Sequence, residues 1–236
     1  MRIHFVAVLV LTIFLTGLTS RAAEIPSITI GTFMQEVRQE FAVADGLPAD
    51  SITAVAALDE NIVFAGTSNG LARFSGGRWA VIPATSGAPV DALVASRDKV
   101  CFVSNGRLFS LEGDKPSLLA ELTRGLKVNS LIAGESIYLA TDQGLFEVSG
   151  GKLKSVGALN ELLGSNASVF QVAAGSRVVV GAAAGLFQQD AKEKWTRLFP
   201  ADKSGRSWAP VNVRGVAYDT RGRLWFASPQ GVGRFD

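Results

Sequence analysis

Five glycines recur along this sequence at intervals of 36 to 46 residues, and each belongs to the same local pattern. A run of β-branched or aromatic residues precedes each glycine and an apolar residue follows it, as in "NIVFAGTSNGLARF" from Asn61 to Phe74. This pattern predicts two strands joined by a tight turn in which glycine supplies a positive φ. The turn glycines are Gly70, Gly106, Gly144, Gly185 and Gly231.

Each repeat has room for four short strands. A short apolar segment precedes every hairpin, as in "ITAV" from Ile52, and a turn with a further strand follows, as in "GGRWAVI" from Gly76. No segment shows the periodicity of an amphipathic helix. Four strands per unit of about forty residues are typical of a β-propeller. The sequence therefore predicts an all-β fold of four-stranded blades stacked around an axis, with five repeats visible.

The stretch "DGLPADSITAVAALDENIVFAGTSNGLARFSGGRW", residues 45–79, resembles the two-component regulator propeller repeat. The segments "GRLWFAS" and "GVGRFD" within residues 222–236 resemble it too, and the resemblance is looser between these units. In the second unit the Gly-Leu step is displaced to Gly106 and Leu108, and in the fourth unit alanines replace the polar turn. The resemblance implies the extracytoplasmic sensing part of a bacterial membrane receptor. Such propellers are often followed by an immunoglobulin-like module, a transmembrane helix and a histidine kinase or cyclase.

The N-terminus predicts a signal peptide over residues 1–22. Arg2 precedes an apolar run, and the small residues Ser20 and Ala22 have the spacing that a signal peptidase reads. The run is shorter than the hydrocarbon core of a bilayer requires. We therefore expect an exported protein, periplasmic or extracellular, that reaches a membrane only through parts outside this chain. The predicted propeller domain is 23–236, with repeats near 45–85, 86–124, 125–163, 164–205 and 206–236, the last incomplete.

Two alternatives are open for the end of the repeat array. The fifth repeat halts where its outermost strand should begin, so the chain is either truncated within a larger propeller or closed as a five-bladed ring. In the second case the missing strand comes from residues 36–43, "EVRQEFAV", which align with the outermost strand of the first repeat. Pairing the first strand with the last would remove both exposed sheet edges.

Charge and composition exclude several classes of function. Without residues 1–22 the chain has 21 basic and 21 acidic residues and no basic run, so nucleic acid is not an expected partner. The only histidine, His4, lies in the predicted signal peptide. Imidazole catalysis and a histidine-ligated metal site are thereby excluded from the mature chain, and no cofactor is expected. Cys101 stands alone in "KVCFVSNG", a pattern typical of a buried strand residue.

One position of the predicted inner segments varies in character while its neighbours are apolar or small. Because the innermost strands of a propeller line its central channel, these side chains would form a ring around it. A ring with polar groups, one cation and one aromatic side chain suits a sugar or a similar small polar ligand. Packing between blades is the alternative role. The ring residues are Thr53, Asp91, Asn129, Phe170 and Arg214.

The four tryptophans have different expected roles. Trp79 and Trp195 recur at the same place in their repeats, which indicates packing in the outer strands, and Trp225 lies in a predicted second strand and is expected in the core. Trp208 breaks this pattern, because it lies in the loop "KSGRSWAPVN" before the fifth repeat. It is therefore a candidate for contact with a ligand or a partner protein.

The sequence favours a non-enzymatic, exported propeller that senses a small polar ligand such as a carbohydrate, or binds a protein. In this hypothesis the chain is the input module of a two-component or related membrane signalling receptor, and its partner is the downstream signalling module. No catalytic constellation is visible, since acids such as Asp59 and Asp142 lie in turn contexts rather than in pairs. A secreted propeller enzyme without histidine, a lyase or a glycoside hydrolase, is one alternative. A structural scaffold is the other.

Overall fold

A computed structural model describes residues 39–96, 99–165, 167–201 and 204–235. The chain divides into two units, Met1–Gln39 and Glu40–Asp236, and the strands of the described residues lie in the second. The predicted signal peptide, residues 1–22, lies outside the described residues. Everything below concerns the second unit.

Nineteen strands form five antiparallel sheets in which neighbours in sequence are neighbours in space. The first sheet consists of β1 (Ile52–Ala57), β2 (Val63–Thr67), β3 (Gly70–Ser75) and β4 (Arg78–Val81). The second consists of β5 (Val90–Ser96), β6 (Lys99–Ser104), β7 (Arg107–Glu112) and β8 (Lys115–Glu121). The third consists of β9 (Val128–Ala133), β10 (Ile137–Thr141), β11 (Gly144–Ser149) and β12 (Lys152–Ser155).

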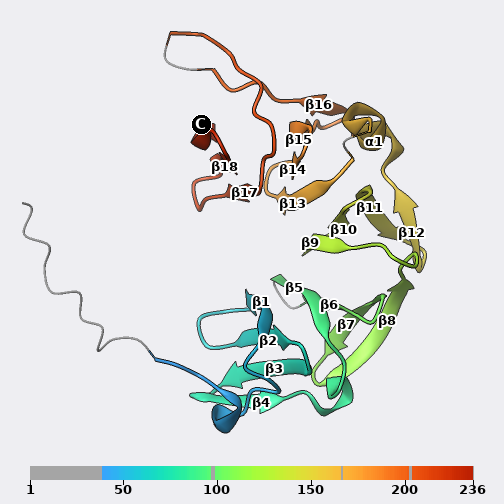
Figure 1. Cartoon of the computed structure of the whole chain (residues 1–236), viewed down its shortest axis with the longest axis vertical. Helices are drawn as coiled ribbons and strands as arrows, with labels where there is room; N and C mark the ends of the chain where they lie inside the picture. Colours follow the sequence, from blue (N-terminus) through green and yellow to red (C-terminus); the bar gives the residue numbers. More distant parts are fainter. Residues whose placement is uncertain (1–38, 97–98, 166, 202–203, 236) are drawn as a thin grey trace, which may run out of the picture. The chain divides into compact units, whose positions relative to one another are not determined.

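The fourth sheet consists of β13 (Val169–Ala174), β14 (Val178–Ala182), β15 (Gly185–Gln189) and β16 (Trp195–Arg197), and the fifth of β17 (Gly215–Tyr218), β18 (Leu224–Ser228) and β19 (Gly231–Phe235). Short helical segments are η2 (Val43–Asp45), η3 (Pro83–Thr85) and α1 (Gly157–Leu163). Figure 1 shows the first strand of each sheet on the inner side, and the inner strands of consecutive sheets are in contact. This is the predicted all-β propeller architecture, with four strands in four blades and three in the described part of the fifth.

The turn between the second and third strands uses the predicted glycine in every sheet. Gly70, Gly144, Gly185 and Gly231 begin their third strands with φ between 125° and 146°, a region that other residues resist. A hydroxyl completes the turn in three sheets. Thr67 Oγ1 donates to the Gly70 carbonyl at 2.9 Å, Thr141 Oγ1 to the Gly144 carbonyl at 2.8 Å, and Ser228 Oγ to the Gly231 carbonyl at 3.4 Å. The strand-turn-strand pattern of the sequence therefore corresponds to a repeated local structure.

Most of the core lies between consecutive sheets, and one further buried cluster lies between the first sheet and the segment before it. Four clusters of buried side chains each combine residues of one sheet with residues of the next. The inner strands meet the preceding sheet through a buried valine at or just before their start, as at Val90, Val169 and Val213. A Cβ on Gly66 would lie 2.6 Å from Val90 Cγ1, and a Cβ on Gly181 would lie 2.5 Å from the Val213 carbonyl oxygen. Glycine in the second strand thus permits the close approach of the next sheet.

The structure contains a helix that the sequence pattern did not indicate. The helix α1 follows the third sheet and buries Leu159 and Leu163 against the fourth. The Asn160 side chain completes the exposed edge of β11, because its Oδ1 accepts from the Leu145 amide at 3.0 Å and its Nδ2 donates to the Leu145 carbonyl at 3.3 Å. At seven residues the helix is too short to show a helical period in the sequence.

The strand that the closed-ring alternative places over residues 36–43 is not formed in its described part. Residues 36–38 lie outside the described residues, 39–42 form no strand, and Val43 begins η2. The Phe41 ring packs on the first sheet, 5.5 Å from the Phe74 ring and 5.9 Å from the Trp79 ring between centroids. This segment therefore belongs with the first sheet.

The expectation of a core position for Trp225 was wrong, since 38% of this residue is exposed. Its counterparts in the other second strands, such as Phe64 and Cys101, pack against the following sheet. No sheet follows the fifth in the described part of the chain. Trp225 instead donates from Nε1 to Asp219 Oδ2 at 2.9 Å and lies under the Arg234 guanidinium.

Replacing Gly181 with alanine should destabilise the fold by about 1–3 kcal/mol, because the new methyl group would overlap the backbone of the next sheet. Urea unfolding measures this loss. Gly157→Ala is the matched control, since nothing lies within 4 Å of its Cβ position and its φ is not positive. The same substitution there should leave the stability unchanged or raise it by up to about 1 kcal/mol. Equal losses in both variants would contradict the close-approach explanation.

Candidate functional site

Four of the five predicted ring residues occupy a β-bulge near the start of an inner strand, and the fifth, Arg214, lies just before its strand. In the first sheet Ile52 pairs with Thr67 and Ala54 with Gly66, so Thr53 has no cross-strand partner. The pairing of the next three sheets skips Asp91, Asn129 and Phe170 in the same way. Arg214 immediately precedes β17, and its backbone amide donates to the Ala227 carbonyl. A bulge turns the side chain of the extra residue away from the alternation of the strand.

All five predicted ring residues line one cavity of about 340 Å³. We call this cavity the central hollow. Its wall is completed by residues that follow the bulges, including Ser130 and Gln171, which the sequence reasoning did not select. In the sequence, these two residues could have been found only from their position directly after a predicted ring residue. The structure thus brings the five side chains together, and their contact with a ligand stays a prediction.

Two of the ring residues also join neighbouring sheets. Thr53 Oγ1 donates to the Val90 carbonyl at 2.5 Å, and Asn129 Nδ2 donates to the Val169 carbonyl at 2.8 Å. Each bond runs from one inner strand to the first residue of the next. Thr53 and Asn129 therefore have the inter-blade role that the sequence left open as an alternative, and both residues also line the central hollow.

Arg214 and Phe170 form a pair across the fourth and fifth sheets. The guanidinium carbon lies 4.1 Å from the centre of the Phe170 ring, within the range of a cation–π contact. Within the described residues Arg214 makes no salt bridge. Stacking fixes the plane of the guanidinium and leaves its N–H donors available to an acceptor in the hollow.

Asp91 is the one carboxylate among the residues that line the central hollow. Partial burial raises the pKa of this carboxyl above its ordinary value, because the charged form loses hydration. No hydrogen bond to its side chain is present among the described residues. The hollow therefore combines an anionic acceptor, a cationic donor and an aromatic face.

Trp208 lies outside the central hollow. Its ring packs on Phe226 of the fifth sheet at 5.9 Å between centroids, and its backbone amide donates to the Pro200 carbonyl. Because 38% of the residue remains exposed, one face is accessible to solvent. The structure gives Trp208 a packing role, and a contact with a ligand or partner is untested.

Other titratable residues have structural explanations. Asp59, Asp190 and Asp219 accept backbone N–H groups two to four residues later in the chain, which is turn chemistry. The hydrogen bond from Trp225 and those from Arg223 and Arg221 hold the pKa of Asp219 well below its usual range. Burial raises the pKa of the Cys101 thiol, as in an unreactive core cysteine.

The described part of the chain has no group of three or more His, Cys, Asp or Glu side chains that could hold a metal ion. Within the same residues, no helix has the length and apolar character needed to cross a membrane.

The sequence matches no protein-family model and no curated protein. Its backbone is similar to solved β-propellers. The extracellular domain of BT3049 from B. thetaiotaomicron, assigned as a hybrid two component system, is 14% identical with a TM-score of 0.61 over 84% of this chain and 30% of that one. An ancestral GH74 enzyme is 12% identical with a TM-score of 0.59 over 81% of this chain and 32% of that one.

The WD40 β-propeller domain of Doa1 is 15% identical, with a TM-score of 0.55 over 79% of this chain and 64% of that one. The chain thus spans about a third of the length of the first two proteins. At these identities the likeness establishes the β-propeller fold alone.

Removing the Thr53 hydroxyl with Thr53→Val should destabilise the protein by about 1 kcal/mol, because the hydrogen bond to the next sheet is lost. Thr53→Ser retains the donor and is the matched control. Urea unfolding of both variants measures the difference. A loss of equal size for serine would show that the methyl group, and not the hydroxyl, matters.

Asp91→Asn should raise the melting temperature at about pH 7 and leave it unchanged at about pH 3. Folding raises the pKa of Asp91, so the stability of the unmodified protein falls as the pH rises from the ordinary aspartate value towards the raised one. Asparagine cannot ionise, so the variant is more stable than the unmodified protein only at pH values above the ordinary pKa of aspartate. Differential scanning calorimetry at both pH values checks this, and an advantage at the acidic pH alone would reverse the assigned sign.

Proposed function

We propose that this protein is an exported, non-enzymatic β-propeller that binds a small polar ligand in its central hollow. One observation carries the proposal: five inner strands turn five chemically different side chains into the same cavity. A volume of about 340 Å³ lies within the range of small-molecule sites and accommodates a mono- or disaccharide-sized ligand.

The geometry favours a ligand rich in oxygen acceptors, such as a carbohydrate or a sugar acid. Arg214 offers donors held in one plane, and Phe170 supports that plane from behind. Asp91 and Asn129 line the same cavity and can accept from ligand hydroxyls. Because Arg214 has no carboxylate partner within the described residues, an acidic oxygen of the ligand would supply the missing counter-charge.

We also propose that binding serves signal input to a membrane receptor. Two observations support this role: the N-terminal pattern is typical of an exported protein, and the fold is shared with the extracellular domain of BT3049. The downstream partner in this proposal is a signalling module that lies outside residues 1–236, and any membrane contact is made through that module.

Catalysis is not part of the proposal. Glycoside hydrolysis ordinarily needs two carboxyl groups that flank the scissile bond, and Asp91 is the one carboxylate among the residues lining the hollow. The GH74 similarity concerns the fold, which hosts many unrelated functions. Turnover of a polysaccharide by the purified protein would favour the enzyme instead.

The test is isothermal titration of the purified protein with a panel of neutral monosaccharides, disaccharides and hexuronic acids. We expect saturable binding that is strongest for an acidic sugar. Arg214→Gln should weaken it by roughly tenfold or more, the effect of losing one charge-assisted hydrogen bond. Arg214→Lys keeps the charge but not the planar fork, and should recover only part of the affinity.

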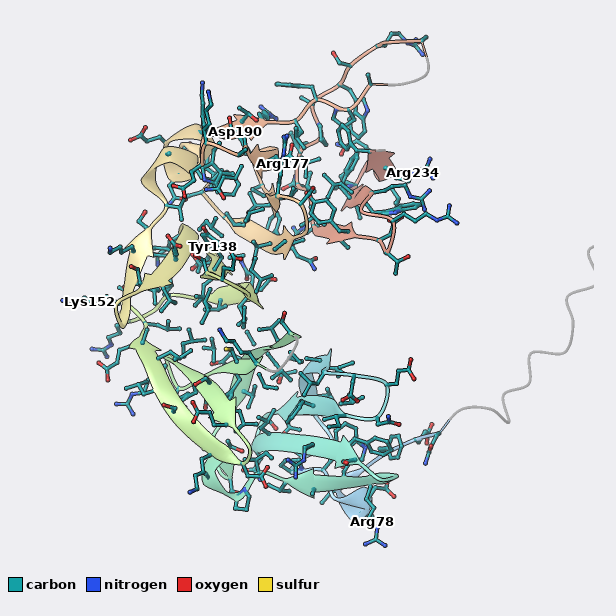
Figure 2. All side chains as sticks on the ribbon, turned by 180° about the vertical axis from the view of Figure 1, so that it is seen from behind. Arg78, Tyr138, Lys152, Arg177, Asp190 and Arg234 are labelled. Atoms are coloured by element: carbon teal, nitrogen blue, oxygen red, sulfur yellow. The ribbon has the colours of Figure 1, made fainter. Side chains whose placement is uncertain are left out.

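Arg78→Gln is the matched control, because it removes a guanidinium from the exposed outer strand β4, far in the fold from the inner strands (Figure 2). This variant should bind as the unmodified protein does. Equal binding by Arg214→Gln and the unmodified protein would exclude the central hollow as the site. A panel without any binding, together with capture of a protein partner, would favour the scaffold.

A further inference from the structure

A second and larger cavity lies between the third and fourth sheets. Its volume is about 690 Å³, and it shares no lining residue with the central hollow. The wall comes from the turns that join β9 to β10 and β13 to β14, and from the loop between β15 and β16. We call this cavity the inter-blade groove. Its charged and hydroxyl-bearing side chains include Glu135, Tyr138, Arg177, Asp190 and Glu193.

The groove is open because the last residue of the inner strand in the fourth sheet is small, whereas the corresponding residue of the fifth sheet is large. The last residue of β17, Tyr218, pairs with the first residue of β18, and Ala174 has the same place in the fourth sheet. The Tyr218 ring lies directly against Gly175 in the turn of the preceding sheet, where a Cβ would approach the ring to 2.6 Å. Ala174 and the corresponding turn glycine, Gly134, both line the groove, and no ring lies within 4 Å of a Cβ placed on Gly134. The groove therefore contains a slot that a six-membered ring occupies at the next junction.

The polar groups around this slot carry an excess of negative charge. Three carboxylates, from Glu135, Asp190 and Glu193, face one guanidinium, from Arg177. Backbone N–H groups of Lys194 and Lys192 lower the pKa of Asp190, which is therefore ionised at neutral pH. Within the described residues neither Glu135 nor Glu193 has a salt-bridge partner. The Arg177 guanidinium donates a hydrogen bond from Nη1 to Gln188 Oε1 at 3.5 Å.

Tyr138 supplies a neutral phenol on the third-sheet wall, and its hydroxyl is hydrogen-bonded to Ser136 and Glu147. Burial, the first cause, and the nearby Glu147 carboxylate raise the pKa of the Tyr138 phenol, so its hydroxyl keeps its proton at neutral pH. Figure 2 shows Tyr138 on the third sheet and Arg177 and Asp190 on the fourth, and all three line the groove. Glu193 has φ of 61°, a conformation uncommon for a residue with a side chain, and it lies at the rim of the same cavity.

We propose that the inter-blade groove is a second binding site, for a ring-shaped polar ligand that carries a protonated amino group, such as an amino sugar. The ring enters the slot beside Gly134 that Ala174 leaves open. The ammonium group is paired by the carboxylates of Glu135 and Glu193, and the ring hydroxyls meet the phenol of Tyr138 and the guanidinium of Arg177. This site does not depend on the central hollow.

Glucosamine is the probe, with glucose and cyclohexylamine as probes that lack the amine or the hydroxyls. Titrations are followed in ¹H–¹⁵N spectra of the full chain, in which the amides of Gly134 and Gly175 report on the groove. We expect saturable shifts of these two amides with glucosamine and weaker binding of the other two probes. Amides next to Asp91 and Arg214 should not shift, which separates this site from the central hollow.

Ala174→Tyr tests the slot by supplying the ring that Tyr218 provides at the next junction. It should abolish the glucosamine shifts at Gly134. Ala57→Tyr is the matched control, because Ala57 ends β1 at the same register position, is exposed, and lies in another sheet. That variant should bind glucosamine as the unmodified protein does.

Glu193→Gln and Glu135→Gln give a second test that keeps the fold, since both side chains are exposed. Each should weaken glucosamine binding by roughly tenfold and leave glucose binding unchanged. The proposal is overturned by unmodified protein that shows no saturable shift, by glucosamine binding that survives in a folded Ala174→Tyr variant, or by binding indifferent to both glutamates.

Discussion

The contact between the start of one inner strand and the second strand of the preceding sheet governs this fold. A single sheet of four short strands has no core of its own, so its apolar residues are buried only when the next sheet covers them. Gly66 and Gly181 allow Val90 and Val213 to approach until only a hydrogen fits between them and the backbone. The sheets are therefore stable as neighbours and not as separate units.

The same contact places the candidate binding residues. The residue after Val90 and the residue after Val169 are bulged, and Arg214 follows Val213 just before β17. All three of these residues line the central hollow, so the geometry that packs two sheets together also places a side chain there. Thr53 and Asn129 add a hydrogen bond between neighbouring sheets. Asp91 instead lies where partial burial raises its pKa, so its ionised form is less favourable than in water. A charged residue that lowers the stability of the fold in this way is typical of binding sites, where recognition of a ligand and folding stability are in conflict.

Most of the fold could be predicted from the sequence repeat, because each strand and turn depends on local residue types. The ring of residues around the central hollow was also predictable. Residues such as Asp91 and Arg214 occupy the one position of each inner segment at which the residue type changes from repeat to repeat, while its neighbours are apolar or small. Other features depend on the neighbouring sheet and left no local signal. The sequence pattern around Trp225 is that of a core residue. The residue is exposed because no further sheet covers it in the described part of the chain. The inter-blade groove was missed for the same reason: Ala174 is an ordinary strand residue, and only the comparison with Tyr218 across two junctions shows the space beside it.

The bulges separate recognition from folding. A bulged residue contributes no cross-strand pair, so a new side chain there leaves the hydrogen-bonded ladder and the valine contact intact. The bulged residues Asp91 and Phe170 give no side-chain hydrogen bond to a neighbouring sheet within the described residues, and neither does Arg214, which precedes β17. At these three positions the chemistry of the hollow can change one blade at a time. A propeller built in this way can acquire a different ligand preference through single substitutions, each made on a scaffold whose sheets remain paired as before.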